Sequence, residues 1–364
     1  MTKPVLIFPG GMPRSLEFLR KCQRENRPVI GASSLGYDPA RPQYPAWLHL
    51  PYITEPEFTE ALRKAVNTHD IGEIYTPNFV VWHQLSKTLA EIAPGVSLAN
   101  VSPVDEVLPY RRALAEARNF IAGAYVLETQ MPPRDWPTEI ELASLIRYAE
   151  VIPGMCDDLK LRALVEIARY SVCGDVVEIG SWWGKSAFIL AHLARCFGIG
   201  NLLCVDPWTN ELLKQNLETV DSASRQADAD EALQVFQIGL LPFNLNHINY
   251  LRQPSVEAAI HYSNGNPVVT EAFGTTRYTG RISILHIDGN HAYESVKADV
   301  EAWCSKVMDG GWIIIDDYVW PFGDGPQRVG DSFLATASAK ISNSFVSGSA
   351  LFIRLSSSVN AQLA

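Results

Sequence analysis

Two acidic clusters follow two short apolar segments in the C-terminal part of the chain. Asp288 follows the segment 282–287, and Asp316 with Asp317 follows the segment 310–315. Both segments are rich in β-branched residues and bounded by polar turn residues, which is typical of buried strands. Because the carboxyl ends of parallel strands meet at one edge of a sheet, we expect the three carboxylates to meet there, together with His291. Their mutual repulsion requires a cation, so the pattern predicts a metal site with a base beside it.

The residue types indicate which cation and which base. Carboxylate oxygens without a cysteine or histidine cluster suit Mg²⁺ rather than Zn²⁺. A cation bound to a hydroxyl oxygen lowers the pKa of that hydroxyl, and a nearby imidazole can accept its proton, which makes His291 the candidate base. The alternatives are an acidic turn that caps a helix and a structural His291. We expect His286, inside its strand, and His192, on a helix face, to be hydrogen-bonded core residues.

A turn with two glycines lies further upstream. Residues 178–186 close a strand and open a helix, with Gly180 and Gly184 in the turn, where glycine lets the backbone approach a ligand closely. A dinucleotide-binding turn carries a third glycine, and a P-loop needs a glycine where this chain has Ile179. The acid Glu178 suits a cationic ligand better than a pyrophosphate. Asp206 ends the next strand, where carboxylates commonly bind ribose hydroxyls.

At these residues the chain resembles the class I S-adenosylmethionine-dependent methyltransferases, because Glu178-x-Gly180-x-x-x-Gly184 looks like their first motif. The resemblance implies that Glu178 and Gly180 lie near the methionine end of the cofactor and Asp206 near its ribose. The full set that we expect at the cofactor is Glu178, Gly180, Ser181, Gly184, Ser186, Asp206 and Asp288. An ordinary strand-turn-helix is the alternative.

Asp288-x-x-His291 with Asp316-Asp317 further resembles the metal-dependent macrocin- and mycinamicin-type sugar O-methyltransferases, over roughly residues 150–355. The resemblance implies Asp288, Asp316 and Asp317 as Mg²⁺ ligands and His291 as the base. It also implies an acceptor hydroxyl on a sugar of a natural-product glycoside or polysaccharide precursor. The first acid of the pair is often glutamate in that family, so Asp316 is a departure, and the division of roles between Asp316 and Asp317 stays open.

The N-terminal residues 1–104 alternate strand and helix patterns. Strands are expected at 5–8, 28–32 and 73–75, and helices from a Ser15 cap to Asn26, at 56–67 and at 79–92. This alternation predicts a small parallel α/β domain, and it resembles the Rossmann-like domain that precedes ATP-grasp catalytic domains. Gly10-Gly11 is either a tight turn or a phosphate site at a helix N-terminus. Residues 105–155, with helices at 105–127 and 138–150, are expected to form a helical linker and a possible surface for homo-oligomers.

Residues 156–364 are expected to form the methyltransferase domain. Helices at 157–170, 186–196 and 293–303 alternate with strands at 175–179, 201–205, 247–251, 282–287 and 310–315, and a hairpin spans 344–355. The predicted fold class is α/β, a Rossmann-like sheet with helices on both faces and a C-terminal antiparallel hairpin. Two polar segments, 207–231 and 261–280, are expected to cover the site. Aromatic residues near the rim suit a ring-shaped acceptor: Trp182, Trp183, Trp208, Tyr318 and Trp320.

Composition limits the remaining possibilities. The 364 residues are 47% apolar and 19% charged, which is typical of a globular protein, and the length favours two domains. The net charge of -10 and the lack of a basic run argue against a nucleic-acid partner. No apolar stretch reaches the roughly 20 residues of a membrane helix, and the N-terminus turns polar too soon for a signal peptide. Six cysteines without a C-x-x-C pair indicate free thiols and a cytoplasmic protein.

Two alternatives to this function remain open at the level of sequence. The first is a metal-independent methyltransferase that acts on a small molecule with His291 alone as base. The second is a catalytically idle protein that uses the same fold to bind a glycan or a nucleotide. A pure binding protein has no need of three clustered carboxylates, which favours the enzyme.

Overall fold

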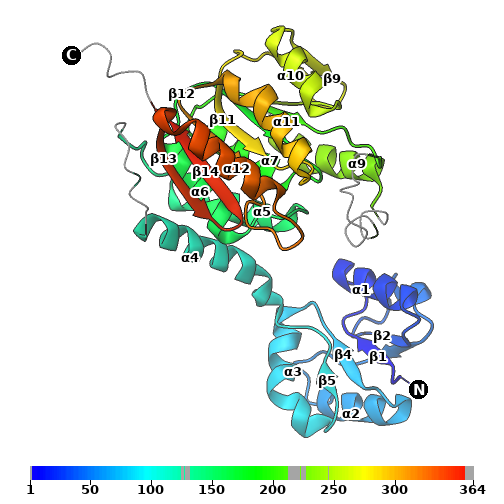
Figure 1. The fold of residues 1–364 in the computed structure, drawn as a ribbon. Helices are drawn as coiled ribbons and strands as arrows, with labels where there is room; N and C mark the ends of the chain where they lie inside the picture. The colour runs from blue at the N-terminus through cyan, green and yellow to red at the C-terminus, as the bar shows by residue number, and fades with distance from the viewer. Residues whose placement is uncertain are drawn as a thin grey trace. The chain divides into compact units, whose positions relative to one another are not determined.

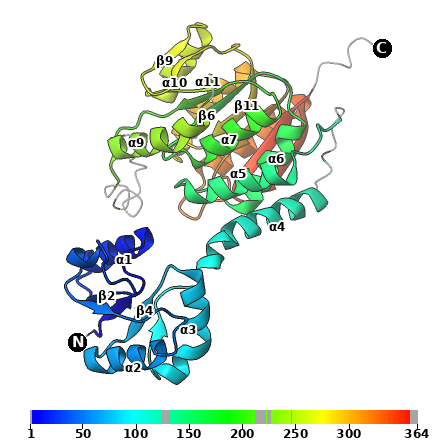
Figure 2. The same cartoon turned by 180° about the vertical axis from the view of Figure 1, so that it is seen from behind.

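The computed structural model describes residues 2–123, 127, 132–211, 222, 227–244 and 246–356. The chain divides into two compact units, Met1–Arg111 and Arg112–Ala364, and the helix α4 (Leu108–Ala122) contains the boundary. The two units are drawn in Figure 1 and, from behind, in Figure 2. The finer division at residues 104 and 155 stays a prediction. None of the helices in the described part of the chain has the length and hydropathy of a bilayer-spanning segment.

The first unit is built on a parallel five-stranded sheet with strand order β3-β2-β1-β4-β5. One apolar cluster packs on each face, the larger one under helices α2 and α3 and the smaller one under α1. The predicted α/β domain is therefore confirmed, while its likeness to the domain that precedes ATP-grasp domains stays a prediction. The elements are β1 (Val5–Ile7), α1 (Pro13–Arg24), β2 (Val29–Ser33), β3 (Trp47–His49), α2 (Phe58–His69), β4 (Glu73–Tyr75), α3 (Phe79–Ile92) and β5 (Ser97–Leu98).

The turn between β1 and α1 differs from its prediction. Helix α1 begins at Pro13, whose ring fixes φ in the helical range, so the predicted Ser15 cap is wrong. Ser15 is buried, and its hydroxyl donates to the Pro9 carbonyl at 2.5 Å. A Cβ on Gly11 would lie 2.6 Å from the Asp38 carboxylate, so close packing explains this glycine and favours the tight turn over a phosphate site.

The second unit contains a seven-stranded sheet with strand order β13-β14-β12-β11-β6-β7-β8. Strands β8, β7, β6, β11 and β12 are mutually parallel, and β14 runs antiparallel to both β12 and β13. This is the fold class predicted from the sequence, including the C-terminal antiparallel hairpin. The strands are β6 (Asp175–Ile179), β7 (Leu202–Val205), β8 (Ile248–Leu251), β11 (Ile282–Ile287), β12 (Val307–Ile315), β13 (Ile341–Ser347) and β14 (Ala350–Leu355).

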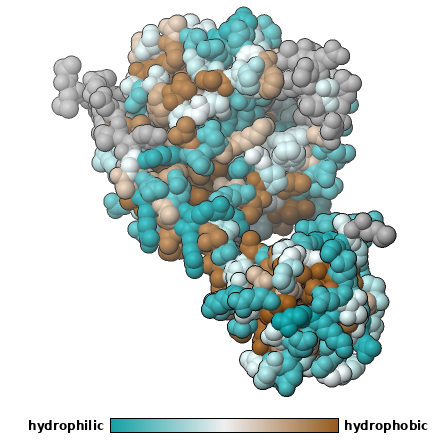
Figure 3. Space-filling view, turned by 90° about the horizontal axis from the view of Figure 1, so that it is seen from below, coloured by the Kyte–Doolittle hydropathy of each residue, from teal (hydrophilic) through white to brown (hydrophobic). Residues whose placement is uncertain are grey.

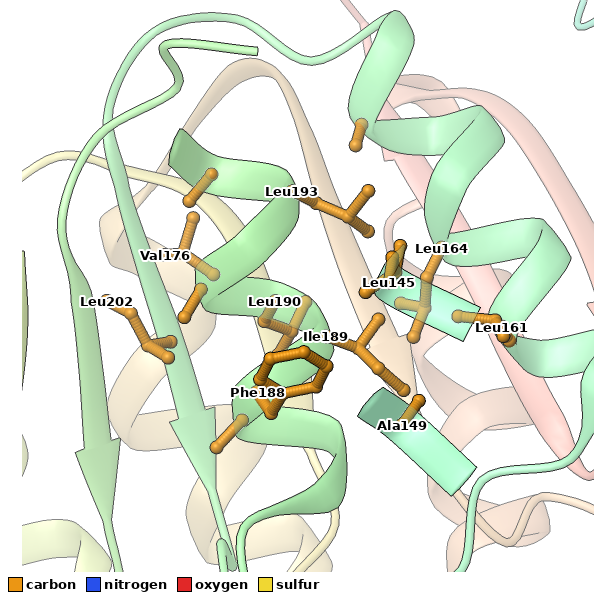
Figure 4. Packing of buried hydrophobic residues seen from close by; sticks show 14 of the residues in the cluster. Leu145, Ala149, Leu161, Leu164, Val176, Phe188, Ile189, Leu190, Leu193 and Leu202 are labelled. Atoms are coloured by element: carbon orange, nitrogen blue, oxygen red, sulfur yellow. The ribbon is translucent and has the colours of Figure 1, made fainter. Parts of the chain in front are cut away.

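Helices cover both faces of this sheet (Figures 1 and 2). On one face, apolar side chains of α7 such as Phe188 and Ile189 pack between the sheet and helices α5 and α6, as Figure 4 shows. On the other face a second cluster forms under α10, α11 and α12. On the surface drawn in Figure 3, hydrophilic and hydrophobic residues are interspersed. The helices are α5 (Glu139–Val151), α6 (Asp158–Arg169), α7 (Lys185–Cys196), α9 (Ala229–Leu240), α10 (Ser255–Ser263), α11 (Tyr293–Trp303) and α12 (Gly325–Thr336).

Two element boundaries were misplaced by the sequence patterns. The predicted helix 105–127 is shorter, because residues 103–107 form a 3-10 turn before α4 and the described helix ends at Ala122. Strand β12 begins at Val307 rather than at Gly310, and its pairing with β11 jumps from Val307 to Trp312. The residues between them form a bulge, in which Gly310 has a φ of 75°.

The polar segment 261–280 does not lie where it was expected. It contains the end of α10 and a small hairpin, β9 (Val268–Thr270) with β10 (Gly274–Thr276). Its end is fixed to the first residue of β6, because the Asp175 carboxylate accepts hydrogen bonds from Tyr262 Oη at 2.6 Å and Thr279 N at 2.7 Å. Tyr278 Oη also donates to the carbonyl of Leu202, the first residue of β7. The segment is anchored at the amino ends of the strands, so the prediction that it covers the opposite rim is wrong.

Asp175→Ala tests this anchor. The substitution leaves the buried Tyr262 hydroxyl and the backbone N–H groups of Thr279 and Gly280 without their acceptor. We expect it to lower the free energy of unfolding by about 2–5 kcal/mol, measured by urea denaturation. The exposed Asp309→Ala is the matched control and should change it by less than about 0.5 kcal/mol. Equal stability of the two variants would contradict the anchoring role.

Candidate functional site

The predicted site residues follow four strands that end at the same level. Ile179 of β6 pairs with Val205 of β7 and with Ile287 of β11, and Ile287 pairs with Ile315 of β12. The next residue on each strand is Gly180, Asp206, Asp288 or Asp316. The register of the sheet thus brings the glycine turn and the acidic clusters to one rim.

The glycine turn is packed against the acid-tipped strand beside it. Gly180 has a φ of 83°, and a Cβ there would lie 2.1 Å from the carbonyl oxygen of Asp288. Gly184 has a φ of 94° at the N-terminus of α7, where a Cβ would press on Phe236. Ser186 lies in the first turn of that helix. Both glycines are therefore required by the fold, whatever ligand the turn holds.

Asp206 holds two loops of the rim together. Its Oδ2 accepts from the backbone N–H groups of Ser181 at 3.1 Å and Trp182 at 3.0 Å, and its Oδ1 accepts from Trp208 N at 2.7 Å. Burial raises the pKa of Asp206, and these three donors oppose that effect. A carboxylate has about four lone-pair sites, so roughly one remains for a hydroxyl donor. The buried Trp208 ring closes the corner by donating from Nε1 to the Trp182 carbonyl at 3.0 Å.

Glu178 and His286 lie beneath the rim and bond to each other. Both side chains are fully buried, and Glu178 Oε1 lies 3.1 Å from His286 Nδ1. His286 Nε2 lies 3.3 Å from Asp316 Oδ2. Burial lowers the pKa of His286, but its hydrogen bonds with Asp316 and Glu178 outweigh burial and raise the pKa to about 9. The expectation that His286 is a hydrogen-bonded core residue is confirmed.

Lys160 of α6 is the residue that sequence reasoning missed. Its side chain is 3% exposed, and its Nζ contacts Asp316 Oδ2, the Met155 carbonyl at 3.4 Å and Asp288 Oδ2 at 3.8 Å. Burial lowers the pKa of Lys160, but the two carboxylates outweigh burial and raise it. The available signal was its spacing, because Lys160 shares the i, i+3, i+4, i+7 face of α6 with buried apolar residues: Ala163, Leu164 and Ile167.

The two acids nearest Lys160 respond in opposite directions. Although burial raises the pKa of Asp316, the Lys160 ammonium and His286 hold it well below its ordinary value. Burial and the neighbouring Asp316 raise the pKa of Asp288 well above its ordinary value. We call Glu178, His286, Asp316 and Lys160 the inner group, in which opposite charges are paired.

Three partly exposed side chains form what we call the outer group: Asp288, His291 and Asp317. One ligand atom from each lies within 4.8 Å of the others, a spacing that can hold a metal ion. His291 Nε2 lies 2.8 Å from Asp317 Oδ2, and the ring of His291 packs on Trp320 with centroids 4.5 Å apart. Asp288 has the same spacing with His286 and Asp316, so it lies between the two groups, with Asp316 in the inner group and Asp317 in the outer group.

The aromatic residues near the rim differ in their exposure to solvent and in their contacts. Trp208 is buried, whereas Trp182 and Trp183 are partly exposed and pack against each other with centroids 5.5 Å apart. Tyr318 Oη donates to Asp331 at 2.6 Å. Of the predicted cover segment 207–231, most residues lie outside the described part of the chain, and α9 begins at Ala229.

Asp299 lies beside the loop that carries Asp288. It projects from α11 toward Gly289, where a Cβ would lie 3.5 Å from its Oδ2. Asp299 is buried, and burial raises its pKa to about 6 although a hydrogen bond with Ser255 opposes this. An acid with a raised pKa binds its proton more tightly in the folded state, so the fold loses stability as the pH rises from about 4 through about 6.

Asp299→Asn should therefore stabilise the protein at pH 8 and lose this advantage below about pH 4. The gain is at most about 3 kcal/mol, since one pKa unit corresponds to about 1.4 kcal/mol. Urea denaturation of both proteins at a series of pH values measures it. An advantage that does not change with pH would show that the buried charge is not its cause.

Part of the chain is similar to known methyltransferases. Residues 177–318 match the model of a methyltransferase domain family. A relative from Streptomyces olivaceus, 8-demethyl-8-(2,3-dimethoxy-alpha-L-rhamnosyl)-tetracenomycin-C 4'-O-methyltransferase, is 26% identical over 188 residues, which are 51% of this chain and 65% of the relative. The chain thus spans just under two thirds of the length of that relative.

Solved structures that match part of this chain include two methyltransferases. The O-methyltransferase NovP is 15% identical with a TM-score of 0.39, over 69% of this chain and 100% of its own. The TDP-rhamnose 3'-O-methyltransferase CalS11 is 16% identical with a TM-score of 0.39, over 70% and 96%. The family match confirms the resemblance first seen at Glu178, Gly180 and Gly184, and the second unit of this chain carries a methyltransferase domain.

Proposed function

We propose that the protein is an S-adenosylmethionine-dependent O-methyltransferase that methylates a hydroxyl group of a sugar-containing acceptor. The observation that carries the proposal is the register of β7, β6, β11 and β12, which aligns the glycine turn and Asp206 with Asp288, His291 and Asp317 at one rim. The sugar acceptor is supported by the Streptomyces olivaceus relative, whose name gives a rhamnosyl 4'-O-methyltransferase.

The rim offers separate places for a cofactor and an acceptor. S-adenosylmethionine supplies an electrophilic methyl group. At the turn 180–184, Asp206 accepts from the backbone N–H groups of Ser181 and Trp182 and keeps roughly one lone-pair site for a ribose hydroxyl. Glu178 is bonded to His286 beneath this turn, so its influence on the cofactor would act through charge rather than through contact.

The outer group fits a hard divalent cation such as Mg²⁺. Mg²⁺ in proteins is commonly bound by one or two carboxylates together with water and substrate oxygens, and Asp288 and Asp317 supply two. When bound, the cation would lower the pKa of an acceptor hydroxyl and fix its position. Imidazole suits softer metals better than Mg²⁺, which favours His291 as base rather than as third ligand.

His291 is placed to accept the proton of the acceptor hydroxyl. Asp317, 2.8 Å from Nε2, and the Trp320 ring restrict the orientation of the imidazole. A base held beside the reacting oxygen would take up the proton that the hydroxyl loses on methylation, so charge would not accumulate on the alcohol. His286 is fully buried and bonded at both nitrogens, so it cannot exchange protons with an acceptor.

Binding and cation dependence test the proposal. We expect S-adenosylhomocysteine to bind the full chain by isothermal titration calorimetry. Methyl transfer from labelled S-adenosylmethionine to a panel of rhamnosyl glycosides should fall at least about tenfold after chelation and return with Mg²⁺. Activity that survives chelation would favour the metal-independent alternative. Failure to bind S-adenosylhomocysteine would remove the methyltransferase proposal and favour a binding protein.

His291→Gln separates the two roles of the imidazole. A base contributes about 10²–10⁴-fold to the rate, so we expect kcat to fall in that range with KM nearly unchanged. Mn²⁺ affinity, measured without cofactor or acceptor, should stay within about threefold of the wild type. A large loss of Mn²⁺ affinity would instead identify His291 as a ligand. His261→Gln, on α10, is the matched control.

A further inference from the structure

We propose that Lys160 is a positioning residue that keeps Asp316 out of the cation site and confines a divalent cation to the outer group. The inference rests on the proposed function, because the cation site of the outer group is part of it. In the acidic pair after β12, Asp317 therefore contacts the cation and its neighbour Asp316 does not.

The carboxylate of Asp316 has no free acceptor site. Its Oδ2 contacts Lys160 Nζ and lies 3.3 Å from His286 Nε2. Its Oδ1 accepts from Asp317 N at 2.9 Å and from Ser349 Oγ at 3.2 Å. These four donors fill the roughly four lone-pair sites of a carboxylate, and the Asp288 side chain also hydrogen-bonds with Asp316. A cation could bind Asp316 only by displacing one of them from a side chain that is 3% exposed.

The ammonium of Lys160 also stands where a cation of the inner group would bind. His286, Asp288 and Asp316 have the spacing of a metal site, but Lys160 Nζ contacts Asp316 and lies 3.8 Å from Asp288 Oδ2. A second positive charge beside the ammonium would be repelled in this buried place. Asp288, Asp317 and His291 are 21%, 25% and 16% exposed and remain accessible from solvent.

The start of α6 fixes the position of Lys160. Asp157 caps the helix by accepting from Lys160 N at 2.8 Å, and the Leu159 carbonyl accepts from Ser347 Oγ in the C-terminal hairpin at 3.0 Å. A lysine is almost never fully buried unless it is paired. The chain thus directs a buried ammonium at two rim acids from a helix that is remote in sequence.

Mn²⁺ binding to the full chain tests the inference, with free Mn²⁺ followed by electron paramagnetic resonance and no cofactor or acceptor present. Lys160→Gln should lower the Mn²⁺ dissociation constant by about threefold or more, because it removes the competing charge and frees Asp316. A lysine with a purely structural role would not tighten Mn²⁺ binding when lost. Lys297→Gln, an exposed lysine on α11, is the matched control and should change nothing.

A double variant keeps the test decisive if Lys160→Gln alone leaves Asp316 unpaired and fails to fold. Lys160→Gln/Asp316→Asn replaces both charges by amides of similar size. Its dissociation constant for Mn²⁺ should stay within about threefold of the wild type, whereas Asp317→Asn should weaken binding by about tenfold or more. If the double variant loses Mn²⁺ as Asp317→Asn does, Asp316 is a ligand and the inference is overturned.

S-adenosylhomocysteine titrations on the same samples distinguish failure of the cation-site inference from failure of the proposed methyltransferase function. Variants that bind it as the wild type does are correctly folded, so their Mn²⁺ affinities can be compared. A wild-type protein that binds S-adenosylhomocysteine but no Mn²⁺ would overturn the inference that Asp317 and not Asp316 binds a cation. The methyltransferase proposal would remain. A wild-type protein that binds Mn²⁺ but no S-adenosylhomocysteine would overturn the proposed function.

Discussion

The contact between Lys160 and Asp316 is the interaction on which the rim depends. A buried carboxylate is costly unless its charge is balanced and its oxygens are bonded. Lys160 and His286 balance Asp316, and Ser349 and the Asp317 backbone complete its bonds. One side chain thereby joins α6, β11, β12 and the C-terminal hairpin. Because the charge of Asp316 is balanced inside the protein, the more exposed Asp288 and Asp317 beside it can bind a ligand.

The same division explains why neighbouring acids differ in chemistry. Asp316 and Asp317 are adjacent in sequence, yet the backbone turns at Asp317, where φ is 49°. One carboxylate points into the paired charges below the rim, and the other lies 2.8 Å from His291 above it. A left-handed φ at a non-glycine residue is uncommon and is often found at functional sites.

The rim was predictable from sequence because it depends on strands. Apolar runs that end in acids predict parallel strands, and parallel strands share an edge, so Asp206, Asp288 and Asp316 could be placed together from order along the chain. Lys160 was not placed, because a lysine on a helix is ordinarily exposed, although its spacing on α6 matches the buried face. The polar segment 261–280 was placed at the wrong edge, since composition does not report which end of a strand a loop packs against. The hydrogen bonds of Asp175 and Tyr278 decide that.

Gly180 has a meaning beyond ligand access. A Cβ there would collide with the Asp288 carbonyl whether or not any cofactor is present. The first glycine of the motif is therefore required because the chain after β6 packs closely against the chain after β11. A chain that kept this fold but lost all catalysis would still need it. The glycine therefore indicates the fold, whereas the side chains above the rim indicate the chemistry.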